Sequence, residues 1–162
     1  MSDVLVAGIG NVFQTDDGFG VEVAGQLALE DLPARVKVED FGIRGVHLAY
    51  ELLEGYSALI LVDAVPMGEA PGTLAVLEPE VDSLTEGAGG VDAHTMGPEV
   101  VLSNLARLGG TLDCIYIVGC QPADLSDGIG LTPAVASSVE NAVDLCIELL
   151  NEITQPADRG TS

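Results

Sequence analysis

Acidic side chains stand close together in a glycine-rich segment near the start of the chain, Gly8-Ile9-Gly10-Asn11-Val12-Phe13-Gln14-Thr15-Asp16-Asp17-Gly18. The segment follows a stretch typical of a strand and precedes one typical of a helix, which is where nucleotide-binding domains carry a phosphate-binding turn. Phe13 occupies, however, the place of that turn's third glycine, and the carboxylates of Asp16 and Asp17 would repel a phosphate. Carboxylates at such a turn favour a bound cation instead.

Asp63 is a second candidate for cation chemistry. It follows the apolar run 58–62, so its carboxylate should lie half-buried at the end of a strand. A carboxylate in that position costs several kcal/mol unless it is paired or coordinated. A helix cap or an ion pair with Arg44 would satisfy Asp63 as well as a metal ion would, and the spacing alone does not choose between them.

The chain has two histidines, His47 and His94. His47 lies in a helical stripe beside apolar residues and is predicted to be structural. His94 precedes a predicted helix start, where it would serve either as a cap or as a ligand. Two carboxylates and one imidazole would form an open site for a borderline divalent metal such as nickel, zinc, manganese or iron, whereas magnesium or calcium would recruit oxygen ligands only.

The charge of the chain limits its partners. Its 26 acidic and 5 basic residues give a net charge of −21, which argues against nucleic acid and against an anionic membrane surface. No apolar run reaches the length of a membrane span, roughly 18 residues. Three cysteines without a metal-binding or redox spacing are predicted to be small core residues in a reducing compartment. We therefore expect a cytoplasmic protein without a membrane or nucleic-acid partner. We also expect a monomer, although neither charge nor cysteine spacing bears on the oligomeric state.

Apolar runs of strand length alternate with helical periods along the chain. The pattern predicts strands at 4–7, 36–41, 58–62, 73–77 and 115–118, and helices at 19–30, 46–53, 98–108 and 133–153. The wholly apolar third strand should be central. The fourth follows a short connection and should be antiparallel to its neighbour. The acidic stretch 78–92 is predicted to be a mobile loop.

This alternation predicts one α/β domain over residues 1–153, with helices on both faces of a mostly parallel sheet, and a flexible tail over residues 154–162. In such sheets ligands bind at the edge formed by the carboxyl ends of the strands. Three loops are expected to bring polar side chains to this edge, and they carry Asp16 and Asp17, Asp63, and His94. A separate loop after the last strand carries Gln121.

Taken together, these segments resemble those of the nickel–iron hydrogenase maturation endopeptidases, which remove a C-terminal extension from the hydrogenase large subunit. The matching segments are Gly8-Ile9-Gly10-Asn11, Thr15-Asp16-Asp17-Gly18, Leu61-Val62-Asp63-Ala64, His94, Val118-Gly119-Cys120-Gln121-Pro122 and Gly130-Leu131-Thr132-Pro133. They run in the family's order and nearly span the chain. Gly42-Ile43-Arg44-Gly45 is similar to one branch of the family.

The resemblance implies a phosphorylase-like, three-layer α/β/α fold with a five-stranded sheet. It also implies that Asp17, Asp63 and His94 are the metal-binding and catalytic trio. Some members have Glu at the position of Asp17, whose side chain is one methylene shorter. The metal would be nickel that the large-subunit precursor already contains, with no organic cofactor, and the trio would bind it as a condition for cleavage.

The hydrolytic step is left open by the sequence. The metal could polarise the scissile carbonyl or activate water, or a carboxylate could act as general base, with Asp16 as the nearest spare acid. Two other functions remain as alternatives, a metal-dependent hydrolase of small substrates and, less favoured by the acidic turn, a nucleotide-binding module.

Overall fold

The computed structural model describes residues 3–43, 45–79 and 98–154. The strands are β1 (Val4–Ile9), β2 (Val36–Gly42), β3 (Ala58–Ala64), β4 (Leu74–Leu77) and β5 (Cys114–Cys120). The helices are η1 (Thr15–Gly18), α1 (Phe19–Leu27), α2 (Gly45–Leu52), α4 (Pro98–Arg107), α5 (Pro133–Ala136) and α6 (Val139–Thr154). Each strand and helix predicted from the pattern is present, with ends shifted by a few residues.

The strands form one five-stranded sheet in the order β2-β1-β3-β5-β4. β1, β2, β3 and β5 are parallel, and only β4 is antiparallel. The central place predicted for the third strand is confirmed. The antiparallel direction of β4 is confirmed too, but its partner is β5, which lies between β4 and the strand that precedes it in sequence.

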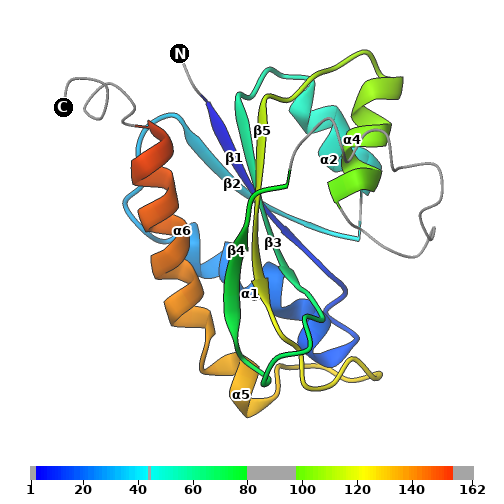
Figure 1. Cartoon of the computed structure of the whole chain (residues 1–162), viewed down its shortest axis with the longest axis vertical. Helices are drawn as coiled ribbons and strands as arrows, with labels where there is room; N and C mark the ends of the chain where they lie inside the picture. Colours follow the sequence, from blue (N-terminus) through cyan, green and yellow to red (C-terminus); the bar gives the residue numbers. More distant parts are fainter. Residues whose placement is uncertain (1–2, 44, 80–97, 155–162) are drawn as a thin grey trace.

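Helices cover both faces of the sheet, as Figure 1 shows. The side chains of α1 and α6 form one apolar core with one face of β1, β3 and β5, whereas α2 and α4 form a second core on the opposite face. β3 is apolar along both faces because it is covered on both, and its residues 58–62 are fully buried. The three-layer α/β/α prediction is therefore confirmed.

The C-terminal helical segment differs from the single helix predicted over 133–153. It is divided into α5 and α6, and Ser138 lies at the break. The Ser138 hydroxyl donates to the Gly72 carbonyl (2.6 Å), which ties the break to the loop before β4. Thr154, predicted to begin a flexible tail, is the last residue of α6. The rest of that tail, and all but the first two residues of the loop predicted at 78–92, lie outside the described residues.

No helix in the described ranges is both long enough and apolar enough to span a membrane. The cysteines are unpaired, and Cys120 and Cys146 are wholly buried in the core between the sheet and α6. Burial, with a smaller contribution from the charge of Asp16, raises the pKa of the Cys120 thiol to about 11. These two cysteines therefore have the core role predicted for them.

Candidate functional site

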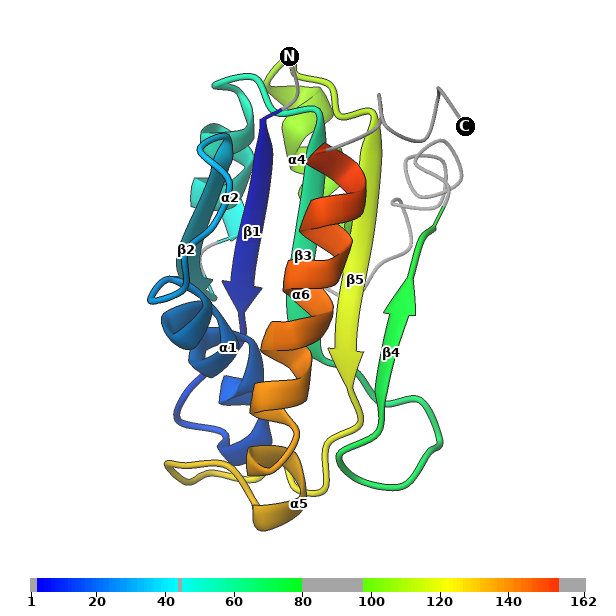
Figure 2. The same ribbon diagram turned by 90° about the vertical axis from the view of Figure 1, so that its left-hand side faces the viewer.

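β1, β3 and β5 are parallel and all end at one edge of the sheet. Figure 2 shows the arrowheads of β1 and β5 pointing the same way. The turn η1 follows β1 at this edge and packs against the end of β3. Asp16 and Asp17 lie in η1, and Asp63 is the next-to-last residue of β3. The expectation that these acids gather at the carboxyl edge is therefore confirmed for the described residues.

Asp17 is held by the glycine-rich turn that precedes it. The Asn11 amide donates to Asp17 Oδ2 (2.7 Å), so an N–H that would face a phosphate in a nucleotide site faces the protein's own carboxylate. Gly10 has φ +136°, and a Cβ there would lie 1.8 Å from the Asp17 carbonyl oxygen. Only glycine fits at position 10, because any side chain would push Asp17 away.

The close approach of α1 to the sheet depends on Gly8 and Gly20. A Cβ on Gly20 would lie 2.0 Å from the Val62 carbonyl oxygen, and one on Gly8 would lie 2.2 Å from the Gly20 carbonyl oxygen. These two glycines do the packing that the third glycine does in nucleotide-binding turns, which leaves position 13 free for Phe13. As a result η1 lies directly beside the end of β3.

Asp63 is half-buried, and one of its oxygens, Oδ1, accepts a hydrogen bond from the Ala64 amide (2.8 Å). Loss of solvent and the negative charge of Asp17 raise the pKa of Asp63 well above its ordinary value, although the Ala64 bond works in the opposite direction. Asp17 and Asp63, called the acid pair below, thus repel one another. A cation between them would relieve both the repulsion and the lost hydration.

Asp16 is wholly buried, and both of its oxygens are occupied. Oδ2 accepts from the amides of Ala123 (2.8 Å) and Asp124 (3.0 Å), and Oδ1 accepts from the amide of Thr132 (2.8 Å). The Thr132 hydroxyl lies 3.0 and 2.9 Å from the two oxygens. Burial alone would raise the pKa of Asp16, but the hydrogen bonds from Thr132, Ala123 and Asp124 outweigh it and hold the pKa below 3.8.

These contacts reveal a role that sequence reasoning missed for Thr132. It was predicted to cap the last helical segment, and it does precede the N-terminal Pro133 of α5, but its side chain makes no capping hydrogen bond. The hydroxyl is directed to Asp16 instead. The Thr132-Pro133 pair predicts only the start of a helix. It does not predict the contact with Asp16, because that buried carboxylate lies 116 positions away in the sequence.

The remaining predicted residues lie outside the acid pair or outside the described ranges. His94 and Arg44 are not among the described residues, so the third ligand and the alternative ion pair are left as predictions. Within the described residues, no group of three or more His, Cys, Asp or Glu side chains could hold a metal ion. His47 is exposed in the first turn of α2, between exposed Val46 and buried Leu48.

The surface on one side of the glycine-rich turn is hollowed. A cavity of about 350 Å³ is lined by Gly10, Asn11, Val12, Phe13, Val21, Asp40, Gly42 and Ile43. Phe13 is 64% exposed and Ile43 is 65% exposed, so large apolar side chains face solvent around this hollow. Exposed apolar surface of this kind is typical of protein interaction sites.

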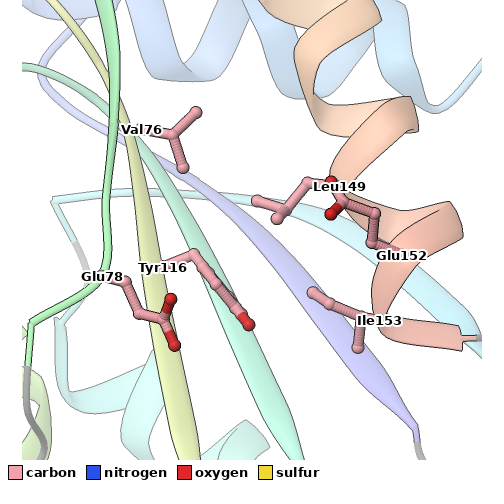
Figure 3. A pocket seen from close by; sticks show the side chains of 6 residues that line it. All are labelled: Val76, Glu78, Tyr116, Leu149, Glu152 and Ile153. Carbon is pink, nitrogen blue, oxygen red and sulfur yellow. The ribbon is translucent and has the colours of Figure 1, made fainter. Parts of the chain in front are cut away.

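A second cavity of about 480 Å³ lies away from this edge, between β4, β5 and α6. Figure 3 shows its side chains, with Tyr116 on β5 and Glu78 just after β4 facing Glu152 and Ile153 on the helix. Tyr116 stands three residues before Gly119, which is the β5 partner of Asp63 in the sheet. This cavity is therefore separate from the acid pair.

Comparison with known proteins identifies the family of the chain. Residues 21–149 match the family model described as hydrogenase maturation protease. The chain is 38% identical over 142 residues to the hydrogenase expression/formation protein HupD of Rhodobacter capsulatus, a match that covers 86% of this chain and 67% of that protein.

Two solved structures have the same fold. The Escherichia coli hydrogenase maturating endopeptidase HybD is 32% identical with a TM-score of 0.78, and the match covers 93% of each chain. A hydrogenase 2 maturation peptidase from a Thaumarchaeota archaeon is 33% identical with a TM-score of 0.72, covering 93% of this chain and 99% of that one. The protein therefore belongs to the hydrogenase maturation protease family and is an endopeptidase.

Proposed function

We propose that the protein removes the C-terminal extension of a nickel–iron hydrogenase large-subunit precursor, and that Asp17, Asp63 and His94 bind nickel already inserted in that precursor. The observation that carries the proposal is the acid pair. Asp63 is desolvated and repelled by Asp17, and none of the ion pairs formed between described residues involves either acid. Such a pair favours a divalent cation supplied by another molecule.

The order of maturation follows from this chemistry. A precursor that contains nickel relieves the repulsion within the acid pair when it binds, whereas a precursor without nickel does not. The free-energy difference between the two complexes is what distinguishes the two substrates. A preorganised set of ligands on one protein completes the coordination of a metal that another protein presents.

The surface around the acid pair favours a protein substrate over a small molecule. Phe13 and Ile43 are exposed, and they line a hollow of about 350 Å³ that also includes Asn11, whose amide donates to Asp17. A hydrolase of small substrates would enclose its substrate more completely. The nucleotide-binding alternative is disfavoured because the Asn11 amide is already bonded to Asp17.

Hydrolysis adds water to the scissile amide, leaving a carboxylate on the large subunit and an amine on the released extension. A general base needs a free lone pair within reach of that water. The Asp16 oxygens already accept bonds from Ala123, Asp124 and Thr132. We therefore favour polarisation of the scissile carbonyl by the substrate's nickel over proton removal by Asp16.

The test is incubation of the purified protein with a large-subunit precursor, prepared with and without nickel, followed by mass measurement of the products. We expect one C-terminal peptide to be released from the nickel-loaded precursor and none from the nickel-free precursor. Equal cleavage of both precursors would exclude recognition of nickel. Hydrolysis of simple esters or phosphates at a comparable rate would favour the small-substrate alternative.

A further inference from the structure

The loop between β5 and α5, residues 121–132, contacts η1 and the loop that follows β3, which are the neighbours in sequence of the two acids. On one side it bonds to η1, which holds Asp17. On the other it bonds to the loop that follows β3, just beyond Asp63. Figure 1 shows this β5–α5 loop crossing the carboxyl edge of the sheet below the ends of the strands.

The contacts with η1 begin at the buried carboxylate of Asp16. Its hydrogen bonds to the amides of Ala123, Asp124 and Thr132 attach η1 to both ends of the β5–α5 loop. The Asp16 amide in turn donates to the Asp124 carbonyl (3.0 Å). Charged hydrogen bonds of this kind are among the strongest that a protein makes. They join η1 to the β5–α5 loop at the residue that precedes Asp17.

The middle of the β5–α5 loop supports the residue before Asp16. Thr15 has φ +51°, a left-handed conformation that a β-branched residue rarely adopts. The Thr15 amide donates to the Gly128 carbonyl (3.0 Å), and its hydroxyl donates to the Ser126 carbonyl (2.7 Å). Such a conformation persists only where the surroundings hold it, and here the β5–α5 loop supplies those surroundings.

Gln121 makes the contacts on the other side. Its side-chain oxygen, Oε1, accepts from the amides of Met67 and Glu69, which follow β3. Its backbone amide donates to the Thr73 carbonyl, and its carbonyl accepts from the Gly72 amide (both 2.9 Å). The loop beyond Asp63 is therefore attached along its length to the first residue of the β5–α5 loop.

We propose that the β5–α5 loop is a positioning element for the acid pair, in which Asp16 fixes the turn that carries Asp17 and Gln121 fixes the loop that follows Asp63. The separation of the two acids is then set by residues that do not touch the metal. The proposal rests on the proposed function only in that Asp17 and Asp63 act together on one ion. Asp16 and Gln121 are positioning residues in this view, and neither is catalytic.

The first test uses Asp16→Asn with Asp127→Asn as its matched control, because Asp127 is an exposed acid of the same loop. Amide hydrogen exchange is read at Asn11, whose N–H reports the position of Asp17, and at Ile60 in the core. Exchange at Ile60 follows global unfolding, so it should speed up in Asp16→Asn only in step with the loss of unfolding free energy measured by urea denaturation. We expect exchange at Asn11 to be roughly tenfold faster in Asp16→Asn through local opening, and exchange at neither amide to change in Asp127→Asn. Unchanged exchange at Asn11 would overturn the proposal.

Processing of the nickel-loaded precursor gives the second readout. A displacement of about 1 Å in a reacting group costs roughly 100-fold in rate, so we expect Asp16→Asn to cleave about 100-fold more slowly at saturating precursor. Loss of cleavage together with unchanged exchange at Asn11 would assign Asp16 to the chemistry and refute a positioning role. If the wild-type protein cleaves no precursor, the proposed function fails, and the exchange result still decides the positioning.

Gln121 keeps the proposal testable if Asp16→Asn does not fold. Gln121→Met removes the oxygen that accepts from Met67 and Glu69, whereas Gln121→Glu retains an acceptor in the same place. We expect Gln121→Met to slow cleavage roughly tenfold and Gln121→Glu to restore most of the rate. Equal rates for the two variants would contradict a role for the acceptor.

Discussion

Asp16 and Asp63 are carboxylates at the same edge of the sheet, and they differ in what surrounds them. Asp16 is buried among N–H and O–H donors from Ala123, Asp124 and Thr132, which hold its pKa below 3.8. Asp63 is desolvated, receives one bond from Ala64 and lies within the field of Asp17, so its pKa is raised. The fold stabilises the charge of Asp16 and gives the charge of Asp63 few partners. Asp63 is therefore the carboxylate available to a cation.

The same substitution, Asp to Asn, should therefore have opposite effects on the free energy of unfolding at the two positions. It removes a stabilised charge at Asp16 and a destabilised one at Asp63. Functional sites commonly carry such unfavourable groups at the expense of stability. This difference separates the acid that builds the site from the acid that acts in it.

The largest expected effect is on cleavage by Asp63→Asn. An amide oxygen is a weaker ligand than a carboxylate and carries no charge to neutralise the cation. We expect processing of the nickel-loaded precursor to fall by at least about 1,000-fold, equivalent to several kcal/mol of transition-state stabilisation. Asp17→Asn and His94→Ala should have similar effects, measured by mass analysis of the products, and wild-type rates in any of the three folded variants would remove that residue from the trio.

Asp16→Asn should have the largest effect on stability. The amide that replaces the carboxylate turns an NH₂ group toward backbone donors, so several buried N–H groups lose part of their hydrogen bonding. We expect the free energy of unfolding at pH 7 to fall by about 3 kcal/mol, measured by urea denaturation with Asp127→Asn as the control. A loss no larger than that of the control would show that the bonds to Asp16 contribute little.

The pH dependence of that loss follows from the lowered pKa of Asp16. Because the folded pKa lies below the ordinary value of 3.8, the unfolded chain binds the proton more readily, and stability is lost as the pH falls through the folded pKa. The difference between wild type and Asp16→Asn should be constant above about pH 5 and shrink below 3.8. A difference that persists undiminished at the lowest pH would mean that the charge is not its source.

Asp63→Asn should raise stability by a smaller amount, about 1 kcal/mol at neutral pH. The folded pKa of Asp63 is raised, so the folded state binds the proton more readily and stability falls as the pH rises from 3.8 to the folded pKa. The gain from Asp63→Asn should therefore grow over that window and level off above it. Urea denaturation across pH measures it, and a destabilised variant would contradict the view that Asp63 is an unfavourable charge.

Sequence patterns predicted most of the fold because β3 and its neighbours are continuous apolar runs bounded by turns. The edge at which Asp17 and Asp63 meet followed from the parallel direction of the strands. The environments of the acids did not follow, because Asp16 and Asp17 are adjacent and chemically identical. Only the fold shows that Asp16 points to Thr132, far along the chain, whereas Asp17 lies in the turn beside Asp63.

The division of the last helical segment could not be predicted for a similar reason. Helical periodicity continues through Ser137 and Ser138, and nothing local indicates a break. The Ser138 hydroxyl bonds to the carbonyl of Gly72, a residue in another loop, and that contact is visible only in three dimensions. Polar contacts between residues far apart in the sequence therefore account for both departures from the prediction, the role of Asp16 at the site and the break between α5 and α6.

The smallest expected effect belongs to His47→Ala, which tests how far the site extends along the edge. His47 lies in the first turn of α2, which follows β2, so it stands near the same edge as the acids without facing the core. An exposed side chain on a helix contributes within about 0.5 kcal/mol to stability, and we expect both stability and processing rate to match wild type. Impaired processing in a folded His47→Ala variant would show that the binding surface reaches α2. Placement at the edge, rather than the unfavourable charge of the acid pair, would then be what marks a functional residue.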